Sequence, residues 1–269
     1  MLRDITLGQY YQTDSLIHRL DPRVKLTVTI LFIITLFVVR GVVGFVLAGL
    51  FLLTIIKLSK VPFKFIVRGM KAIIFLLLFA VFFNLFLTPG EPALTFWKIT
   101  ITWEGIRLAL MLTTRLIMLI LGSSIMTLTT TPNNLTDGME RLMKPLKVLR
   151  VPVHEVAMMM SIALRFIPIL LEETDRIMKA QIARGADFES GNIVKKAKSL
   201  VPLFVPLFIS AFSRANDLAM AMGARCYRGG DYRTKMKPLI YKTRDRLAYI
   251  FTLLFLTGTI VLDRLFMIG

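Results

Sequence analysis

The chain has 269 residues, of which 55% are hydrophobic, and its mean hydropathy is +0.68. Soluble domains are about 45–50% apolar, and here the apolar residues are gathered into runs separated by charge, which indicates an integral membrane protein. The net charge is +17, but Lys and Arg flank the apolar runs, which argues against a nucleic-acid-binding protein. Cys226 is the single cysteine, which excludes an intrachain disulfide, and with two histidines it argues against a metal site.

Five apolar runs follow in chain order: 26–39, 42–56, 72–87, 108–129 and 247–262. The first two are short, because as helices they would measure roughly 21–23 Å against a hydrocarbon core of about 30 Å. We interpret them as a hairpin that turns at Arg40-Gly41, with basic residues snorkelling at its ends. The alternative is one long kinked or re-entrant segment.

The basic residues predict the orientation of these spans. The loop 57–71 carries five Lys or Arg and no acid, and 1–25 carries four, so both are expected on the cytoplasmic side. The loop 88–107 has two acids and two bases and is expected outside. Residues 130–246 hold 20 Lys or Arg and 11 Asp or Glu and are expected in the cytoplasm. The result is five spans, with the N-terminus in the cytoplasm and the C-terminus outside.

The predicted fold class is an all-α membrane protein in three parts: transmembrane helices 1–4 in 1–129, a cytoplasmic domain in 130–246, and a last transmembrane helix in 247–269. The middle part is expected to hold a short helix to about 150, followed by two long helices to 185 and 225. The first halves of the long helices are apolar, at 156–171 and 201–212. We favour packing at the membrane surface for them, and two additional spans are the alternative.

A four-spaced ridge of small residues runs along the second long helix: Ala211, Ala215, Ala219 and Gly223. Such a ridge lets another helix cross at close distance, so we predict that the two long helices cross there. Alanine as a good helix former is the simpler alternative.

Sequence patterns of catalysis are absent. The chain has no phosphate-binding loop, no Gly-x-Ser-x-Gly, no His-Glu-x-x-His and no cysteine cluster, so no catalytic residue, metal ligand or bound cofactor is predicted. The run Met158-Met159-Met160 is expected to pack in a core, because consecutive helical residues point in different directions. Arg115 is the one charge within a predicted span. It could pair within the bundle, line a path or snorkel outward.

Two tripeptides end the two long helices: Ala183-Arg184-Gly185 and Ala224-Arg225-Cys226. A single arginine at a helix C-terminus is explained by its interaction with the last carbonyls and the helix dipole. Two copies with the same small-Arg-small pattern favour a second interpretation, in which the small flanking residues leave each guanidinium clear to enter an acidic groove on another protein.

At these residues the chain resembles the transmembrane T component of energy-coupling factor transporters, within the CbiQ-like superfamily. The stretch 15–25, which includes Asp21, Pro22 and Arg23, is similar to the N-terminal signature of that family, and the tripeptides are similar to its coupling-helix motifs. The resemblance covers nearly the full length. Cys226 stands where glycine is common in the family.

The resemblance implies a non-catalytic scaffold in the prokaryotic cell membrane. Two cytoplasmic ATPase subunits, which carry ATP and Mg, would each receive one arginine-tipped helix. A membrane-embedded S component would capture a vitamin and dock on the apolar halves of the long helices. Alternatives are a T component dedicated to cobalt or nickel, a conventional ABC permease, which usually shows an E-A-A-type loop that is not found, and a lipid-modifying membrane enzyme, for which only His154 and Glu155 give a hint.

Overall fold

The computed structural model describes residues 10–71, 73–96, 99–186, 193–229, 236 and 238–268. Its contacts divide the described chain into two compact units. The bundle unit comprises residues up to 141 together with those from 239 onward, and the hairpin unit comprises 142–238. This division by contacts falls at 141/142 and 238/239, and the membrane boundaries at 129/130 and 246/247 stay predictions.

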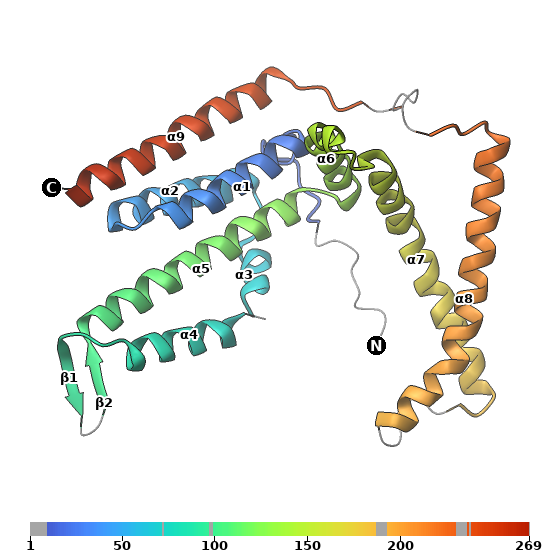
Figure 1. The fold of residues 1–269 in the computed structure, drawn as a ribbon, viewed down its shortest axis with the longest axis horizontal. Helices are drawn as coiled ribbons and strands as arrows, with labels where there is room; N and C mark the ends of the chain where they lie inside the picture. The colour runs from blue at the N-terminus through green and yellow to red at the C-terminus, as the bar shows by residue number, and fades with distance from the viewer. Residues whose placement is uncertain are drawn as a thin grey trace. The chain divides into compact units, whose positions relative to one another are not determined.

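The bundle unit consists of helices with one small β-hairpin (Figure 1). Its elements are α1 (Pro22–Val38), α2 (Val42–Ser59), α3 (Phe63–Lys71), α4 (Ile74–Leu87), β1 (Pro92–Phe96), β2 (Ile99–Thr102), α5 (Trp103–Thr129), α6 (Pro132–Met143) and α9 (Thr243–Ile268). The strands are antiparallel, with Pro92 opposite Thr102 and Phe96 opposite Ile99. The all-α prediction holds for the class, but it treated 88–107 as a loop and missed this hairpin.

The predicted α1–α2 hairpin is confirmed. Helix α1 ends at Val38 and α2 begins at Val42, so the chain reverses over three residues. Gly44 in the first turn of α2 has no room for a side chain. A Cβ there would lie 2.5 Å from Val39 Cγ1 and 2.6 Å from Asp263 Oδ1.

Four described helices are long and apolar enough to cross a membrane: α2, α5, α9 and α7 (Val153–Ala183). Three of these match predicted spans. The other two predicted spans form shorter helices, α1 with 17 residues and α4 with 14. Helix α7 joins the group because its N-terminal half is strongly apolar, which is the property that raised the alternative of additional spans.

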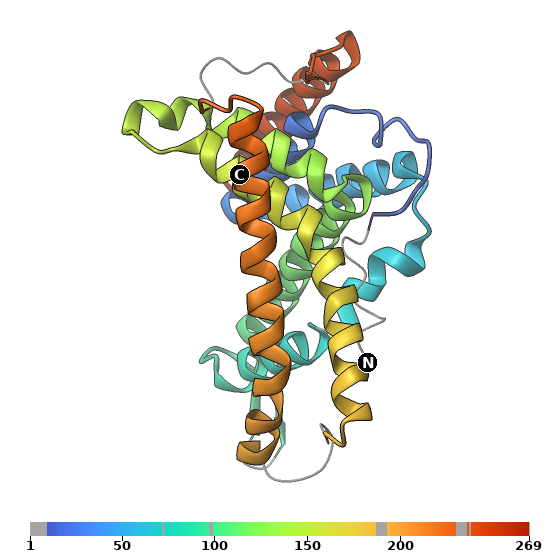
Figure 2. The same ribbon diagram turned by 90° about the vertical axis from the view of Figure 1, so that its right-hand side faces the viewer.

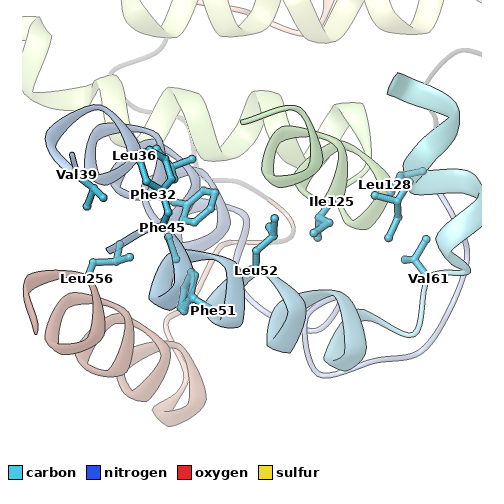
Figure 3. Packing of buried hydrophobic residues seen from close by; sticks show 12 residues of the cluster. Phe32, Leu36, Val39, Phe45, Phe51, Leu52, Val61, Ile125, Leu128 and Leu256 are labelled. Atoms are coloured by element: carbon cyan, nitrogen blue, oxygen red, sulfur yellow. The ribbon is translucent and has the colours of Figure 1, made fainter. Parts of the chain in front are cut away.

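The core of the bundle unit lies where α1, α2, α5 and α9 meet (Figure 3). Phe51 of α2 packs against Phe32 of α1 and Phe255 of α9, with ring centroids 5.9 and 5.3 Å apart. A Cβ on Gly122 of α5 would lie 3.0 Å from the Phe32 ring, so this glycine lets α5 approach α1 closely. The core thus joins helices from both ends of the sequence.

The hairpin unit contains the 3-10 helix η2 (Lys144–Leu149), α7 and α8 (Ile193–Ala224). Helices α7 and α8 lie side by side and run in opposite directions (Figures 1 and 2). Two contacts fix the antiparallel register. Glu173 Oε2 lies 3.3 Å from an Arg214 guanidinium nitrogen, and the Gln181 side-chain amide donates to Pro202 O at 3.5 Å. The prediction of two long helices packed on each other is confirmed.

Candidate functional site

The first arginine tripeptide forms the C-terminal cap of α7. Arg184 is the C-cap residue, and its N–H donates to the carbonyls of Ala180 and Gln181. The Gly185 N–H donates to Ile182 O at 2.9 Å, and the Ala186 N–H donates to Gln181 O at 2.9 Å. This pair of bonds is the Schellman motif, which satisfies the last carbonyls of a helix when the residue after the cap is left-handed. Gly185 meets that condition with φ +86°.

The second tripeptide builds the same cap on α8. The Cys226 N–H donates to Gly223 O at 2.9 Å, and the Tyr227 N–H donates to Met222 O at 3.1 Å. Arg225 occupies the position of Arg184, and Cys226 occupies the position of Gly185. Cys226 is left-handed with φ +56°, although it is not glycine. The two tripeptides are therefore equivalent in backbone geometry as well as in sequence.

This geometry changes the explanation of the third residue of each tripeptide. The sequence suggested that Gly185 and Cys226 are small in order to leave the guanidinium clear. The structure shows that both positions require a left-handed backbone, which costs a residue with a Cβ about 1–2 kcal/mol. Glycine adopts this conformation freely, and Cys226 adopts it at that cost.

Both arginine side chains are exposed. Among the described residues, neither Arg184 nor Arg225 has a hydrogen-bonded or ion-paired side-chain partner. The Schellman motifs already satisfy the last carbonyls through backbone N–H groups, so the guanidinium groups are not needed for capping. We call Arg184 and Arg225, at the ends of their helices, the arginine tips. Each arginine tip thus presents five N–H donors on a fixed backbone.

The two tips lie at opposite ends of the helix pair, at equal distances from its ion pair. Arg184 follows Glu173 by eleven residues, and Arg225 follows Arg214 by eleven residues. At 1.5 Å per residue each tip is about 16 Å from the ion pair along its own helix. Because the helices are antiparallel, the two arginines lie on opposite sides of the ion pair along the helix pair. The Glu173–Arg214 ion pair is therefore the midpoint between the arginines.

The predicted small-residue ridge faces α7 in part. Three of its members line a shared open cavity with three large side chains of α7; the ridge members are Ala211, Ala215 and Ala219, and the α7 residues are Ile162, Phe166 and Leu170. Gly223 is different, because a Cβ there would meet nothing within 4 Å. That the ridge determines how the helices cross stays a prediction.

The residues of the N-terminal signature form a buried network at one end of the bundle. Asp21 caps α1 and accepts from the backbone N–H of Arg23 at 2.9 Å, while Pro22 occupies the first helical turn, where no N–H is needed. The Arg23 side chain makes a two-pronged ion pair with Asp21, at 3.0 and 2.8 Å, and lies over the Tyr241 ring at 3.7 Å. Burial favours a higher pKa of the Asp21 carboxyl, but the Arg23 hydrogen bonds and charge outweigh it and hold that pKa below its usual value.

Asp245 of α9 ties this network to the other end of the chain. Its carboxylate accepts from the Asp21 N–H at 2.9 Å and from the Lys242 N–H at 2.8 Å, so one side chain caps α9 and holds the start of α1. Lys25, just before the apolar run of α1, donates to Thr129 O at 2.7 Å at the end of α5. Burial lowers the pKa of Lys25 to about 8, against the opposing charges of Asp21 and Asp245. The signature residues thus connect the ends of three helices, α1, α5 and α9.

A second buried carboxylate closes the opposite end of the bundle. Asp263 of α9 accepts from the backbone N–H groups of Arg40, Gly41 and Gly44 at 3.0–3.2 Å, at the start of α2. An anion at a helix N-terminus satisfies its free N–H groups and its dipole. Arg115 of α5 donates to Val39 O at 3.0 Å at the same turn, so of the three readings of Arg115 the pairing within the bundle is the one observed.

Sequence reasoning missed Asp245 and Asp263. Asp263 lies directly after the last apolar run, and an acid at the end of a predicted span is a signal that could have identified it. Its partners could not be read from the sequence, because they lie more than 200 positions away.

Comparison with known proteins identifies relatives along nearly the whole chain. Residues 13–237 match the model of the Cobalt transport protein family, CbiQ. The chain is 54% identical over 250 residues to the energy-coupling factor transporter transmembrane protein EcfT of Clostridium kluyveri, covering 92% of this chain and 93% of the relative. The proteins of the same name from Ruminiclostridium cellulolyticum and Bacillus subtilis are 48% and 47% identical, covering 99% and 91% of this chain and 100% and 93% of their own. This chain is a multi-pass membrane protein that belongs to the family of energy-coupling factor transporter transmembrane proteins.

Proposed function

We propose that this chain is the non-catalytic scaffold that couples two ATPase subunits to substrate uptake in an energy-coupling factor importer of the cell membrane. The observation that carries the proposal is the pair of exposed arginines, Arg184 and Arg225, on matching Schellman caps. ATP and Mg would be bound by the ATPases, and no cofactor by this chain. The N-terminus and the hairpin unit would face the cytoplasm, where ATP is available.

Each arginine suits an acidic groove on an ATPase. A guanidinium binds a carboxylate through two parallel hydrogen bonds, and such charge-assisted bonds are among the strongest in proteins. The left-handed residue after each arginine turns the chain away from the helix axis, so that the tip ends in the arginine. Two tips at opposite ends of one helix pair suit two separate subunits, one at each end.

The apolar side chains of α8 offer a surface for a membrane-embedded S component, which would capture a vitamin. Six large apolar residues between 201 and 212 are more than half exposed in the isolated chain: Val201, Phe204, Val205, Phe208, Ile209 and Phe212. A patch of this kind marks an interaction surface. When the ATPases move together on binding ATP, the tips would move with them, and the helix pair would transmit the motion to the docked S component.

Charge reversal at the tips tests the proposal. In the double variant Arg184→Glu and Arg225→Glu, the ATPases should no longer co-purify with the membrane chain, and ATP-driven uptake should be lost. Each single variant should weaken both. The matched control is Arg228→Glu, which makes the same charge change at an exposed residue three positions after Arg225. Retention of the ATPases and of uptake in the double variant would refute the proposal.

A second candidate substrate class is cobalt or nickel, which the description of the matching family favours. The membrane scaffold would act in the same way, and the S component would bind the metal ion. Measuring ATP-dependent uptake of labelled cobalt and of labelled vitamins, with the S components co-expressed one at a time, separates the two. Uptake of cobalt alone would assign the metal.

A further inference from the structure

A small apolar tip at the start of the hairpin unit has no place in the proposed coupling role. We define the η2 tip as residues 144–150, which comprise η2 and its C-cap. Val148 is 88% exposed and Leu149 is 72% exposed. Two adjacent branched apolar side chains held this far into solvent indicate a surface that is covered in the working protein.

The backbone of the η2 tip is fixed by its own hydrogen bonds. Arg150 is left-handed with φ +60°, its N–H donates to Lys147 O at 3.0 Å, and the Val151 N–H donates to Leu146 O at 3.4 Å. Pro145 holds the first turn. The tip is therefore a closed turn that presents Val148 and Leu149 at its end.

Within five positions of these two side chains in the sequence, the charged residues are all basic. Lys144, Lys147 and Arg150 are all exposed, and the sequence has no Asp or Glu from 141 to 154. Apolar residues flanked by Lys and Arg are typical of segments that lie in the interface of an anionic membrane. Their side chains enter the headgroup layer there, and the cations meet phosphates.

Helix α7, which follows the η2 tip, favours lipid over a soluble protein as the partner that covers the tip. Only Val151 and Pro152 separate the η2 tip from α7, whose first half is apolar enough to enter a membrane. A soluble partner at this position would have to approach against that apolar segment. The tip therefore lies next to a part of the chain that is itself suited to the bilayer.

We propose that the η2 tip is an interfacial anchor that inserts Val148 and Leu149 into the headgroup layer of an anionic leaflet, with Lys144, Lys147 and Arg150 on lipid phosphates. The anchor fixes the start of α7 at the membrane surface. It is independent of the proposed coupling function, because it involves neither arginine tip.

The single native cysteine makes a direct test possible. In a Cys226→Ser background, Val148→Cys is labelled with the environment-sensitive fluorophore NBD, and the full chain is reconstituted in phosphatidylcholine vesicles with or without phosphatidylglycerol. The matched control label is at Asp217→Cys, an exposed site on the second half of α8. Doxyl-labelled lipids report the contact of each fluorophore with the bilayer.

The expected result is a blue-shifted emission at position 148 that doxyl lipids quench, at least twofold more with phosphatidylglycerol than without it. Position 217 should show neither effect. Replacing Lys144, Lys147 and Arg150 by Gln, or adding 0.5 M salt, should remove the phosphatidylglycerol dependence. The anchor is ruled out if position 148 emits as in water in both vesicles. Quenching that is equal in both vesicles, or protection that arises only when ATPase subunits are added, would also overturn it.

Discussion

The cap of α8 leads to a quantitative prediction, because Cys226 occupies a backbone conformation that glycine adopts without cost. In Cys226→Gly the left-handed strain of about 1–2 kcal/mol is relieved. The greater conformational freedom of glycine in the unfolded chain favours unfolding, and this offsets about 0.4–1 kcal/mol of the gain. The net stabilisation of the cap is therefore about 0.5–1 kcal/mol, which corresponds to a roughly 2–5-fold smaller equilibrium constant for opening of the last turn of α8.

Hydrogen exchange measured by mass spectrometry on the full chain in detergent reports this opening at the N–H groups of Cys226 and Tyr227. Cys226→Ala is the control, because it removes the sulfur and keeps the Cβ, so exchange should not slow. Gly185→Ala should accelerate exchange at the α7 cap by a similar factor, since its Cβ meets nothing within 4 Å and only the backbone is strained. Equal exchange in Cys226→Gly and Cys226→Ala would refute the reasoning.

Three further predictions concern the stability of the bundle unit. Asp245→Asn should destabilise it by about 1–3 kcal/mol, because one of the two N–H groups bound by Asp245 then faces an amide NH2 group. Gly44→Ala should cost about 1–3 kcal/mol by overpacking, whereas Gly258→Ala, with open space around its Cβ, should not destabilise. The free energy of unfolding should rise by up to about 3 kcal/mol from pH 8 to pH 10.5, because the unfolded chain keeps the Lys25 proton over this range while the folded chain has released it.

Thermal unfolding in detergent measures all three. An unchanged midpoint in Asp245→Asn would show that the two N–H groups find other acceptors. Equal effects of Gly44→Ala and Gly258→Ala would contradict the close approach at the α1–α2 turn. The pH dependence should disappear in Lys25→Met, and a rise that persists in this variant must come from another group.

Local patterns were enough to predict most of the helices and the two tips. Arg40-Gly41 marked the turn between α1 and α2, because charge and glycine interrupt the apolar run there. The left-handed cap of α7 could have been inferred from Gly185, since glycine is the usual residue in that conformation. Cys226 carries no such signal by itself, and only its equivalence to Gly185 makes the second cap predictable.

The hydrogen bonds that connect α9 to α1 and α2 could not be predicted, because they join residues far apart in the sequence. Asp245 binds the Asp21 N–H, and Asp263 binds the N–H groups at the start of α2, each across more than 200 residues. No periodicity or motif in one sequence indicates which distant N–H group a carboxylate will meet. The β-hairpin was missed for a different reason, since its strands are only five and four residues long.

The two carboxylates of α9 also constrain the order in which the protein is completed. A ribosome makes α1 and α2 first and α9 last. The N–H groups of Asp21, Arg40 and Gly41 therefore lack their carboxylate acceptors on α9 until the chain is more than 200 residues longer. Until α9 is inserted, the bundle is open at both ends. A nascent chain that stops before α9 lacks both carboxylates, so these N–H groups have no acceptor from α9.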